Sequence, residues 1–262
     1  MYPGGFFGLD WLRVLITPIG LFGIGFFVLY LRNDGVRVGR TIALLLSIAV
    51  VALLGAKLFS LYVRGWEFYT PLSAEWRGGL RYPGALIGML VFGPLLKRWL
   101  LPELPLGRFF DVLAITVCFC FALVRISCLL NGCCTGVACE GFYCLSYAPG
   151  SQAWYVQLQQ GMLPAHTHPS HPVLPLHLLF MAASLAVGLF LMWFDGRRSF
   201  NGQTALLYLV LHEGAKGLLE SLREPYVLQL QLTSLLISAG ALAVLLAMLA
   251  RYRKRADQSR KL

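Results

Sequence analysis

The dominant pattern along the chain is a series of long apolar stretches, separated by shorter segments that hold most of the charges and prolines. We place seven such stretches at residues 12–31, 40–63, 84–100, 109–131, 173–194, 203–221 and 227–250. A helix needs about 17–25 mainly apolar residues to cross the hydrocarbon core of a bilayer, and most of these stretches reach that length. The pattern therefore predicts an all-α integral membrane protein with about seven transmembrane helices, forming a single polytopic membrane domain over residues 1–262.

Composition supports this class of protein. Hydrophobic residues make up 58% of the chain and charged residues 13%, whereas a soluble domain carries about 25% charged residues. A soluble protein could not cover so much apolar surface with so few charges. The segment from Met1 to Leu12 has no basic region and no cleavage site of small residues, so we expect no removable signal peptide.

The positive charges indicate an orientation. Most of the 22 Lys and Arg residues follow the first, third, fifth and seventh stretches, and the largest group lies in the tail at 251–262. Because cytoplasmic segments are enriched in Lys and Arg, we expect the N-terminus outside and the C-terminus in the cytoplasm. The tail suits the anionic lipid of the bilayer, and we expect no nucleic acid as a partner.

Two segments on the predicted outer side are long enough to carry function. Residues 64–83 contain aromatic residues that suit the lipid headgroup level. Residues 131–172 are rich in Cys, Gly, Pro and His and show no clear helical period. Long loops of this kind are often functional.

An ionisable residue inside a transmembrane helix is a candidate functional residue, because it is costly to bury in lipid. Arg125, near the outer end of the fourth stretch, is the clearest case. It could bind a lipid phosphate with two parallel hydrogen bonds. The alternative is a structural arginine that pairs with Glu220 or caps backbone carbonyl groups.

The sixth stretch carries a second polar pattern. His212, Lys216, Glu220 and Arg223 are spaced by four, four and three residues, so they share one helix face. We predict an ion network of Lys216, Glu220 and Arg223 that lines a polar cleft. The alternative is a ladder of internal salt bridges that only makes a polar helix tolerable in lipid.

The seven cysteines are clustered, at Cys118, Cys120, Cys128, Cys133, Cys134, Cys139 and Cys144. On an oxidising outer side we expect one or two disulfides, with Cys133 and Cys134 bonded to other partners rather than to each other. Nearby histidines (His166, His168, His171) make a metal site conceivable. However, the chain has neither a C-x-x-C nor an H-x-x-x-H pair, so we predict no metal and no cofactor. A thiol nucleophile in the Asn-Gly-Cys-Cys turn is a further alternative.

Five segments together resemble a known family in their order and spacing. They are Gly55–Leu58, Gly78–Gly88, Arg125–Gly136, His171–Pro172 and Gly214–Pro225. These segments resemble the motifs of the prolipoprotein diacylglyceryl transferases. Those enzymes of the bacterial plasma (inner) membrane move diacylglyceryl from phosphatidylglycerol to the cysteine thiol of a lipobox.

The resemblance implies a multi-pass enzyme of lipoprotein biosynthesis, with phosphatidylglycerol and prolipoproteins as substrates and no cofactor. Lys216 stands where the family has an arginine. Lysine keeps the positive charge but lacks the planar guanidinium group. The resemblance implies substrate-binding roles for Arg125, Lys216, Arg223, Asn131, Gly132 and Gly136.

Besides Lys216, the chain departs from the family pattern at four positions, one of which is the tyrosine of the family's first span, which has no clear match here and lies nearest to Pro18. The family's histidine aligns with Pro83, which can neither take nor give a proton, and its asparagine and glutamate align with Cys128 and Cys133. The proton transfer that the resemblance implies therefore needs other residues, and the candidates for catalysis are Glu220, His212 and Tyr82. The alternative is a divergent relative that acts as a lipid-binding or thiol/redox membrane protein.

Overall fold

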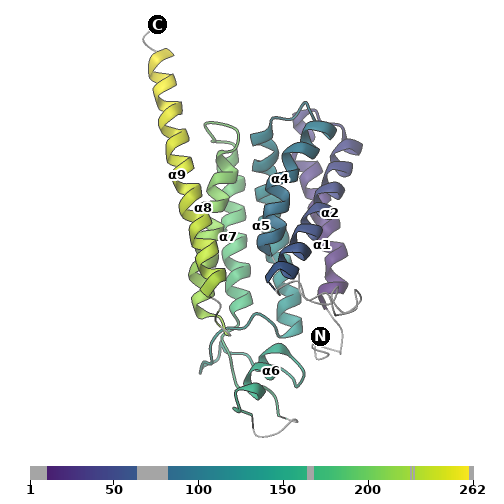
Figure 1. The fold of residues 1–262 in the computed structure, drawn as a ribbon, viewed down its shortest axis with the longest axis vertical. Coiled ribbons are helices and arrows are strands. Elements are labelled where there is room, and N and C mark those ends of the chain that lie inside the picture. Colours follow the sequence, from purple (N-terminus) through teal and green to yellow (C-terminus); the bar gives the residue numbers. More distant parts are fainter. Residues whose placement is uncertain (1–10, 64–81, 164–167, 225, 227, 260–262) are drawn as a thin grey trace. The chain divides into compact units, whose positions relative to one another are not determined.

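The computed structural model describes residues 11–63, 82–163, 168–224, 226 and 228–259, and this part of the chain contains eight α-helices (Figure 1). Two 3-10 turns, Arg32–Asp34 and Glu220–Leu222, accompany them. The α-helices are α1 (Trp11–Tyr30), α2 (Val38–Val63), α4 (Tyr82–Leu100), α5 (Leu106–Asn131), α6 (Gln152–Gln159), α7 (Leu176–Asp195), α8 (Gln203–Leu219) and α9 (Leu228–Ser259).

The all-α class is confirmed, and each of the seven predicted stretches coincides with one α-helix. Four helical segments are long and apolar enough to cross a membrane: Val38–Phe59, Leu106–Asn131, Leu176–Asp195 and Leu228–Lys254. Val14–Tyr30 is a shorter apolar helix. The protein is thus a membrane protein with several apolar helices, while the count of seven spans and the orientation remain predictions.

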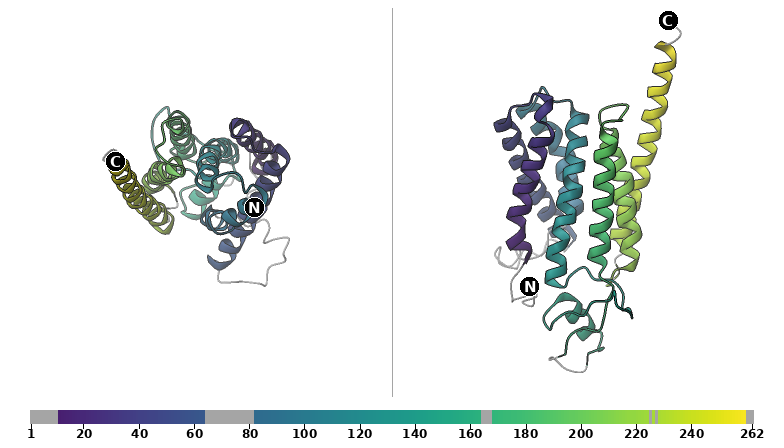
Figure 2. Two further views of the ribbon diagram at one scale, coloured as in Figure 1. Left: turned by 90° about the horizontal axis from the view of Figure 1, so that it is seen from above. Right: turned by 180° about the vertical axis from the view of Figure 1, so that it is seen from behind.

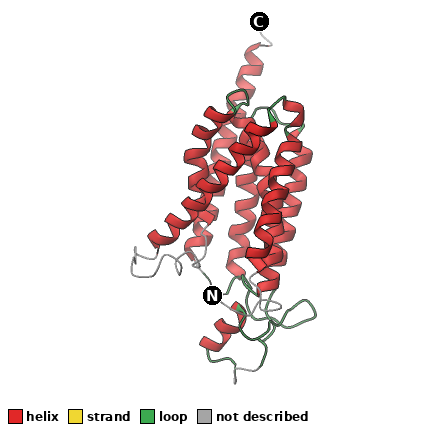
Figure 3. Ribbon diagram, turned by 90° about the vertical axis from the view of Figure 1, so that its right-hand side faces the viewer, coloured by secondary structure: helices red, strands yellow, loops and turns green. Residues whose placement is uncertain are grey.

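Two helical features were not predicted. The basic tail continues α9 as far as Ser259, and α6 lies within the segment that was expected to lack a helical period. In Figure 3 the connection between α5 and α7 consists of loops around this one short helix. Of the two predicted outer segments, residues 64–81 lie outside the described part of the chain.

The chain forms two compact units. Ile24–Phe109 make up the first, and the second contains the part of α1 before Ile24 together with everything from Phe110 onward. In the first unit α2 and α4 pack closely, with Gly55 on α2 facing Gly84 and Gly88 on α4. A Cβ atom on Gly55 or Gly84 would overlap the backbone carbonyl of the other residue, so the two backbones meet directly.

In the second unit α7, α8 and α9 run side by side (Figures 1 and 2). Helix α5 packs on α7 at Gly188, where an added Cβ would lie 3.1 Å from the Cβ of Cys118. The start of α8 has a glycine N-cap, Gly202, without a capping side chain. The fully buried Asp111 of α5 takes that role, because its carboxylate accepts the backbone N–H groups of Gly202 (2.8 Å) and Ala205 (2.9 Å).

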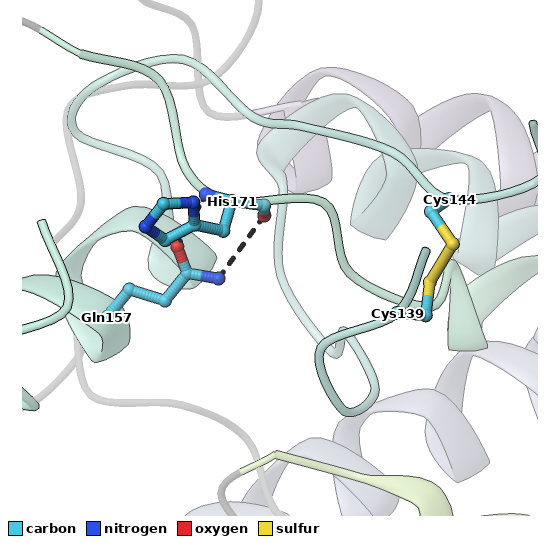
Figure 4. The surroundings of a disulfide bond; sticks show 4 residues. All are labelled: Cys139, Cys144, Gln157 and His171. Atoms are coloured by element: carbon cyan, nitrogen blue, oxygen red, sulfur yellow. Dashed lines mark hydrogen bonds between the residues drawn. A yellow bond between two sulfur atoms is a disulfide. The ribbon is translucent and has the colours of Figure 1, made fainter. Parts of the chain in front are cut away.

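Polar contacts help to hold the arm, by which we mean the described residues of 132–175 that join α5 to α7. The hydroxyl of Ser151 caps α6 by accepting the N–H of Trp154 at 3.3 Å. Gln157 of α6 both donates to and accepts from the backbone of His171, and a disulfide joins Cys139 to Cys144 (Figure 4). This disulfide confirms the prediction that the segment contains one.

The close approach of α2 and α4 predicts that Gly55→Ala destabilises the protein by about 1–3 kcal/mol, because the new methyl group has to push the two backbones apart. The measurement is the thermal unfolding midpoint of the detergent-purified protein. Gly39→Ala is the matched control, since Gly39 lies on the same helix with open space around it. Equal midpoints for the two variants would contradict this packing.

Candidate functional site

Arg125 lies on α5 and is buried between two aromatic rings. Its guanidinium carbon is 4.2 Å from the ring centre of Phe121, one turn earlier on the same helix, and 4.5 Å from that of Phe180 on α7. Cation–π contacts of this kind stabilise a desolvated arginine by about 2 kcal/mol. The Nε atom has no hydrogen-bond partner within the described part of the chain. Arg125 is thus positioned by rings, which leaves N–H donors for an anion.

A chain of hydrogen bonds connects α8 to α7 beside Arg125. The Lys216 Nζ lies 3.4 Å from Glu213, whose other oxygen lies 3.3 Å from Nδ1 of His212. The Nε2 of His212 is 3.2 Å from the hydroxyl of Ser184, which donates to the carbonyl of Phe180 at 2.8 Å. Since that hydroxyl proton is committed to Phe180, Nε2 must donate to Ser184. One more proton then lies between His212 and Glu213.

The predicted ion network on α8 is present with one change of partner. Arg223 donates to both carboxylate oxygens of Glu220, at 3.0 and 3.1 Å, which confirms that pair. Lys216 forms its salt bridge with Glu213, a residue that was not part of the predicted network. Glu220 is still close enough to Lys216 to stabilise its charge. Glu213 is fully buried, so it neutralises Lys216 where water cannot.

The Asn-Gly-Cys-Cys turn is the C-terminal cap of α5. Cys133 donates its N–H to the carbonyl of Cys128 (3.0 Å), and Gly132 donates to Leu129 (3.3 Å). Together with the positive φ of Gly132 (60°), these bonds define a Schellman motif, in which the residues at the positions of Cys128 and Cys133 come into contact. A Cβ on Gly132 would also lie 2.7 Å from the ring of Tyr147.

A third cysteine joins these two. Cys134 has a φ of 55°, and it is the one non-glycine residue of the described chain in the left-handed region. This conformation costs about 1–2 kcal/mol. The Sγ atoms of Cys128, Cys133 and Cys134 all lie within 4.8 Å of one another, and we call these three residues the thiol cluster. In the described structure their thiols are free, so the prediction that Cys133 and Cys134 form disulfides with other residues was wrong.

Two arginines face the thiol cluster. The Nη2 of Arg223 donates to the Cys134 sulfur at 3.3 Å, and the Nη1 of Arg125 lies 4.0 Å from the Cys128 sulfur. Hydrogen bonds from Cys128 and Cys133, followed by the charges of Arg223 and Arg125, hold the pKa of the Cys134 thiol well below its ordinary value, although burial opposes this. Hydrogen bonds with Cys128 and Cys134, together with burial, raise the pKa of Cys133. Of these two thiols, that of Cys134 therefore ionises more readily.

The arm is fixed to the α8–α9 connection, and this brings Cys134 to Arg223. Val137 donates its N–H to the carbonyl of Leu222 (3.0 Å), and Glu224 donates to that of Thr135 (3.2 Å). Gly136 lies between these bonds, where an added Cβ would be 2.8 Å from the Leu222 carbonyl oxygen. Gly136 is thus required by a close approach of two backbones.

The structure brings together most of the predicted site residues. Arg125, Arg223, Glu220, Gly132 and Gly136 gather at the C-terminal end of α5 and the arm, with Lys216 and His212 in the adjoining hydrogen-bond chain. The side-chain carbonyl of Asn131 accepts the N–H of Trp11 at 3.0 Å, which ties the start of α1 to the end of α5. The side chains of Tyr82 and Pro83 lie outside the described part of the structure.

Sequence reasoning missed a second polar pair beside the thiol cluster. The hydroxyl of Tyr147, in the arm, lies 3.1 Å from Nε2 of His177, which is fully buried near the start of α7. Burial raises the pKa of Tyr147 above its ordinary value. A histidine inside an apolar stretch is a detectable signal, whereas the pairing of Tyr147 with it depends on the path of the arm.

These features define an all-helical membrane protein with buried arginines at the ends of its helices, next to a disulfide-containing arm. The chain belongs to the prolipoprotein diacylglyceryl transferase family, whose sequence model matches residues 15–251. This match confirms the family that the sequence motifs indicated.

Two curated relatives support the assignment. A phosphatidylglycerol–prolipoprotein diacylglyceryl transferase of Symbiobacterium thermophilum is 25% identical over 228 residues, which cover 82% of this chain and 77% of that protein. A protein of the same name from Rhodopirellula baltica is 34% identical over 121 residues, or 42% of this chain and 24% of its own length.

The buried pair of Lys216 and Glu213 yields a stability prediction. Glu213→Gln leaves the Lys216 charge buried without its partner, which costs about 3–5 kcal/mol and lowers the thermal unfolding midpoint of the purified protein. The double variant Glu213→Gln/Lys216→Met removes both charges and should recover most of that loss. Glu140→Gln, at an exposed position of the arm, is the control. If the double variant is less stable than Glu213→Gln alone, the loss of the charge pair does not explain the instability of Glu213→Gln.

Proposed function

We propose that this protein transfers a diacylglyceryl group from phosphatidylglycerol to the cysteine thiol of a prolipoprotein lipobox, in the bacterial plasma membrane. The observation that carries the proposal is Arg125, a desolvated cation fixed between Phe121 and Phe180 with N–H groups to spare. The phosphodiester of a phospholipid is an anion that can form hydrogen bonds with such an arginine. The family relationship supplies the reaction.

The reaction makes two demands on the site. A thiolate attacks the glyceryl carbon, a C–S bond forms, and the C–O bond to phosphate breaks so that glycerol phosphate leaves with the electron pair. The thiol proton has to go to a base, and the charge on the leaving phosphate has to be stabilised. Arg125 meets the second demand, with Lys216 adding positive charge from α8.

The first demand needs a base other than the family's histidine, because Pro83 occupies that position. Of the two candidates whose side chains are described, Glu220 is linked to the thiol cluster through Arg223. His212 is already bonded at both ring nitrogens. We therefore assign the proton acceptor to Glu220, with Arg223 positioning its carboxylate.

The proposal includes seven membrane spans, with the N-terminus and the arm outside. The Cys139–Cys144 disulfide supports this side for the arm, since disulfides persist in oxidising compartments. On that side a secreted lipobox peptide can reach the end of α5.

A second candidate function is thiol or redox chemistry in a membrane protein that kept the lipid-binding scaffold. The thiol cluster favours it, because Cys128 and Cys133 stand where the family has an asparagine and a glutamate. Redox cycling of these thiols in the working protein, followed by mass spectrometry, would distinguish this function from lipid transfer.

The transfer proposal predicts that Arg125→Ala lowers the transfer of labelled diacylglyceryl to a lipobox peptide at least about 100-fold, because the leaving phosphate loses its preorganised donors. The assay uses purified protein in phosphatidylglycerol liposomes. Arg197→Ala is the matched control, since Arg197 also lies over a ring, that of Trp193 at 4.2 Å, but is exposed at the end of α7.

Undetectable transfer by the wild-type protein would overturn the proposal. Complementation of a transferase-depleted bacterium adds a second test, with Pro83→His alongside the wild type. Growth with the wild type supports the proposed reaction. Rescue by Pro83→His but not by the wild type would show that the fold still supports the family reaction, whereas the chemistry of the wild-type protein has changed.

A further inference from the structure

The thiol cluster is built by the backbone rather than by chance contact. The Schellman motif brings Cys128 and Cys133 together, and the left-handed conformation of Cys134 turns a third sulfur toward them. Glycine would adopt that conformation without strain. Strained non-glycine conformations gather at functional sites, so the retained side chain at residue 134 indicates a use for its sulfur.

We propose that Cys128, Cys133 and Cys134 bind one thiophilic d10 metal ion, Zn²⁺ or Cu⁺. Metal–sulfur bonds of about 2.3 Å place the sulfurs of a tetrahedral or trigonal site roughly 3.8–4.0 Å apart. The sulfurs of the thiol cluster already lie within 4.8 Å of one another, so small side-chain movements bring them to that spacing. The proposal does not depend on the transfer reaction.

The surroundings supply the charge that such a site needs. Three thiolates around a divalent or monovalent ion leave a net negative charge, which is costly at a buried helix end. Arg223 already donates to the Cys134 sulfur at 3.3 Å, and Arg125 lies 4.0 Å from the Cys128 sulfur. N–H···S bonds from outside the ligand sphere orient the ligands and stabilise the thiolates.

His177 lies close enough to the thiol cluster for the charge of Cys134 to act on it, and its ring would have to move toward the three sulfurs to provide a fourth ligand. Its Nε2 bonds to the Tyr147 hydroxyl at 3.1 Å, which orients the ring. Its Nδ1 is buried near the backbone of Cys133 and makes no hydrogen bond of good geometry with any described atom. A hydrogen bond at one ring nitrogen is the usual arrangement when the other nitrogen binds a metal. A Cys₃His set suits Zn²⁺, whereas three thiolates alone suit Cu⁺.

These ligands do not form a C-x-x-C pair, the usual spacing of zinc-binding cysteines. The three ligands follow a C-x₄-C-C pattern, in which the first lies in the last turn of a helix and the others lie beyond its cap. The nearby histidines considered with the cysteines were His166, His168 and His171. The backbone carbonyls of the latter two accept bonds from Trp154 and Gln157 of α6.

The test is metal binding by the full-length, detergent-purified protein, stripped with a chelator and reduced under anaerobic conditions. Zn²⁺ and Cu⁺ are each titrated in competition with a chromophoric chelator, and we expect one equivalent bound with nanomolar affinity. Cys134→Ser should weaken binding at least about 100-fold, and His177→Gln should weaken Zn²⁺ more than Cu⁺. Cys120→Ser is the control, because Cys120 lies on α5 outside the thiol cluster.

A second measurement needs no variant and so does not depend on variant folding. One equivalent of the bound ion should protect Cys128, Cys133 and Cys134 of the wild type from alkylation, as counted by mass spectrometry, while Cys120 reacts unchanged. Unchanged alkylation of the three thiols would overturn the proposal. So would equal affinities of the wild type and Cys134→Ser, or a disulfide within the thiol cluster that persists under reducing conditions.

Discussion

Positive charge buried among apolar helices has to be compensated locally, and this requirement organises the second unit. Lys216 is neutralised by Glu213, Arg223 by Glu220, and Arg198 by Asp195 at 3.1 Å. In each pair the acidic partner is almost fully buried, so water contributes little to its stabilisation. The cost of leaving one charge alone exceeds the gain from most single packing contacts, and each of these pairs avoids it locally, between residues three apart in the chain.

Arg125 is the exception, and the proposed function rests on it. It receives ring faces instead of a carboxylate, and a ring stabilises a cation less than a carboxylate does. Within the described structure, a cation held in this way is positioned without a carboxylate partner, so an incoming anion does not have to displace one. The same residue in a salt bridge would have to break that bridge first. Aromatic positioning is thus what separates a binding residue from a structural one in this bundle.

The helices could be predicted from the sequence because a bilayer requires long apolar segments, and these are evident in the order of apolar and polar residues. Helix α6 could not be predicted from the sequence. Three of its eight residues are glutamines, and the helix depends on the Ser151 cap and on the hydrogen bond between Gln157 and His171. In the site, the Glu220–Arg223 pair was predictable from its spacing of three. The Lys216–Glu213 pair has the same spacing, but Glu213 does not belong to the series of His212, Lys216 and Glu220 at steps of four, from which the network was predicted.

Two of the positions at which the chain departs from the family pattern touch in the structure, which the sequence does not show. Cys128 and Cys133 replace two family residues that are five positions apart, and a linear comparison treats them as separate changes. In the Schellman motif these are the two positions that touch. The thiols at these two positions therefore lie in one turn, with that of Cys134 as a third. Three thiols gathered at one point favour a ligand for them over loss of function.

Lipid binding and metal binding would draw on the same arginine. The Arg125 guanidinium lies 4.0 Å from the Cys128 sulfur, and a phosphate bound to its free donors would lie beside thiolates that bind a metal. Two anions that share one cation oppose each other, so each weakens the binding of the other. Linkage requires this weakening to be the same in both directions. A metal at the cluster would convert three separate thiols into one complex of fixed charge, and the occupancy of the metal site would then set how much of Arg125 remains available to a lipid headgroup.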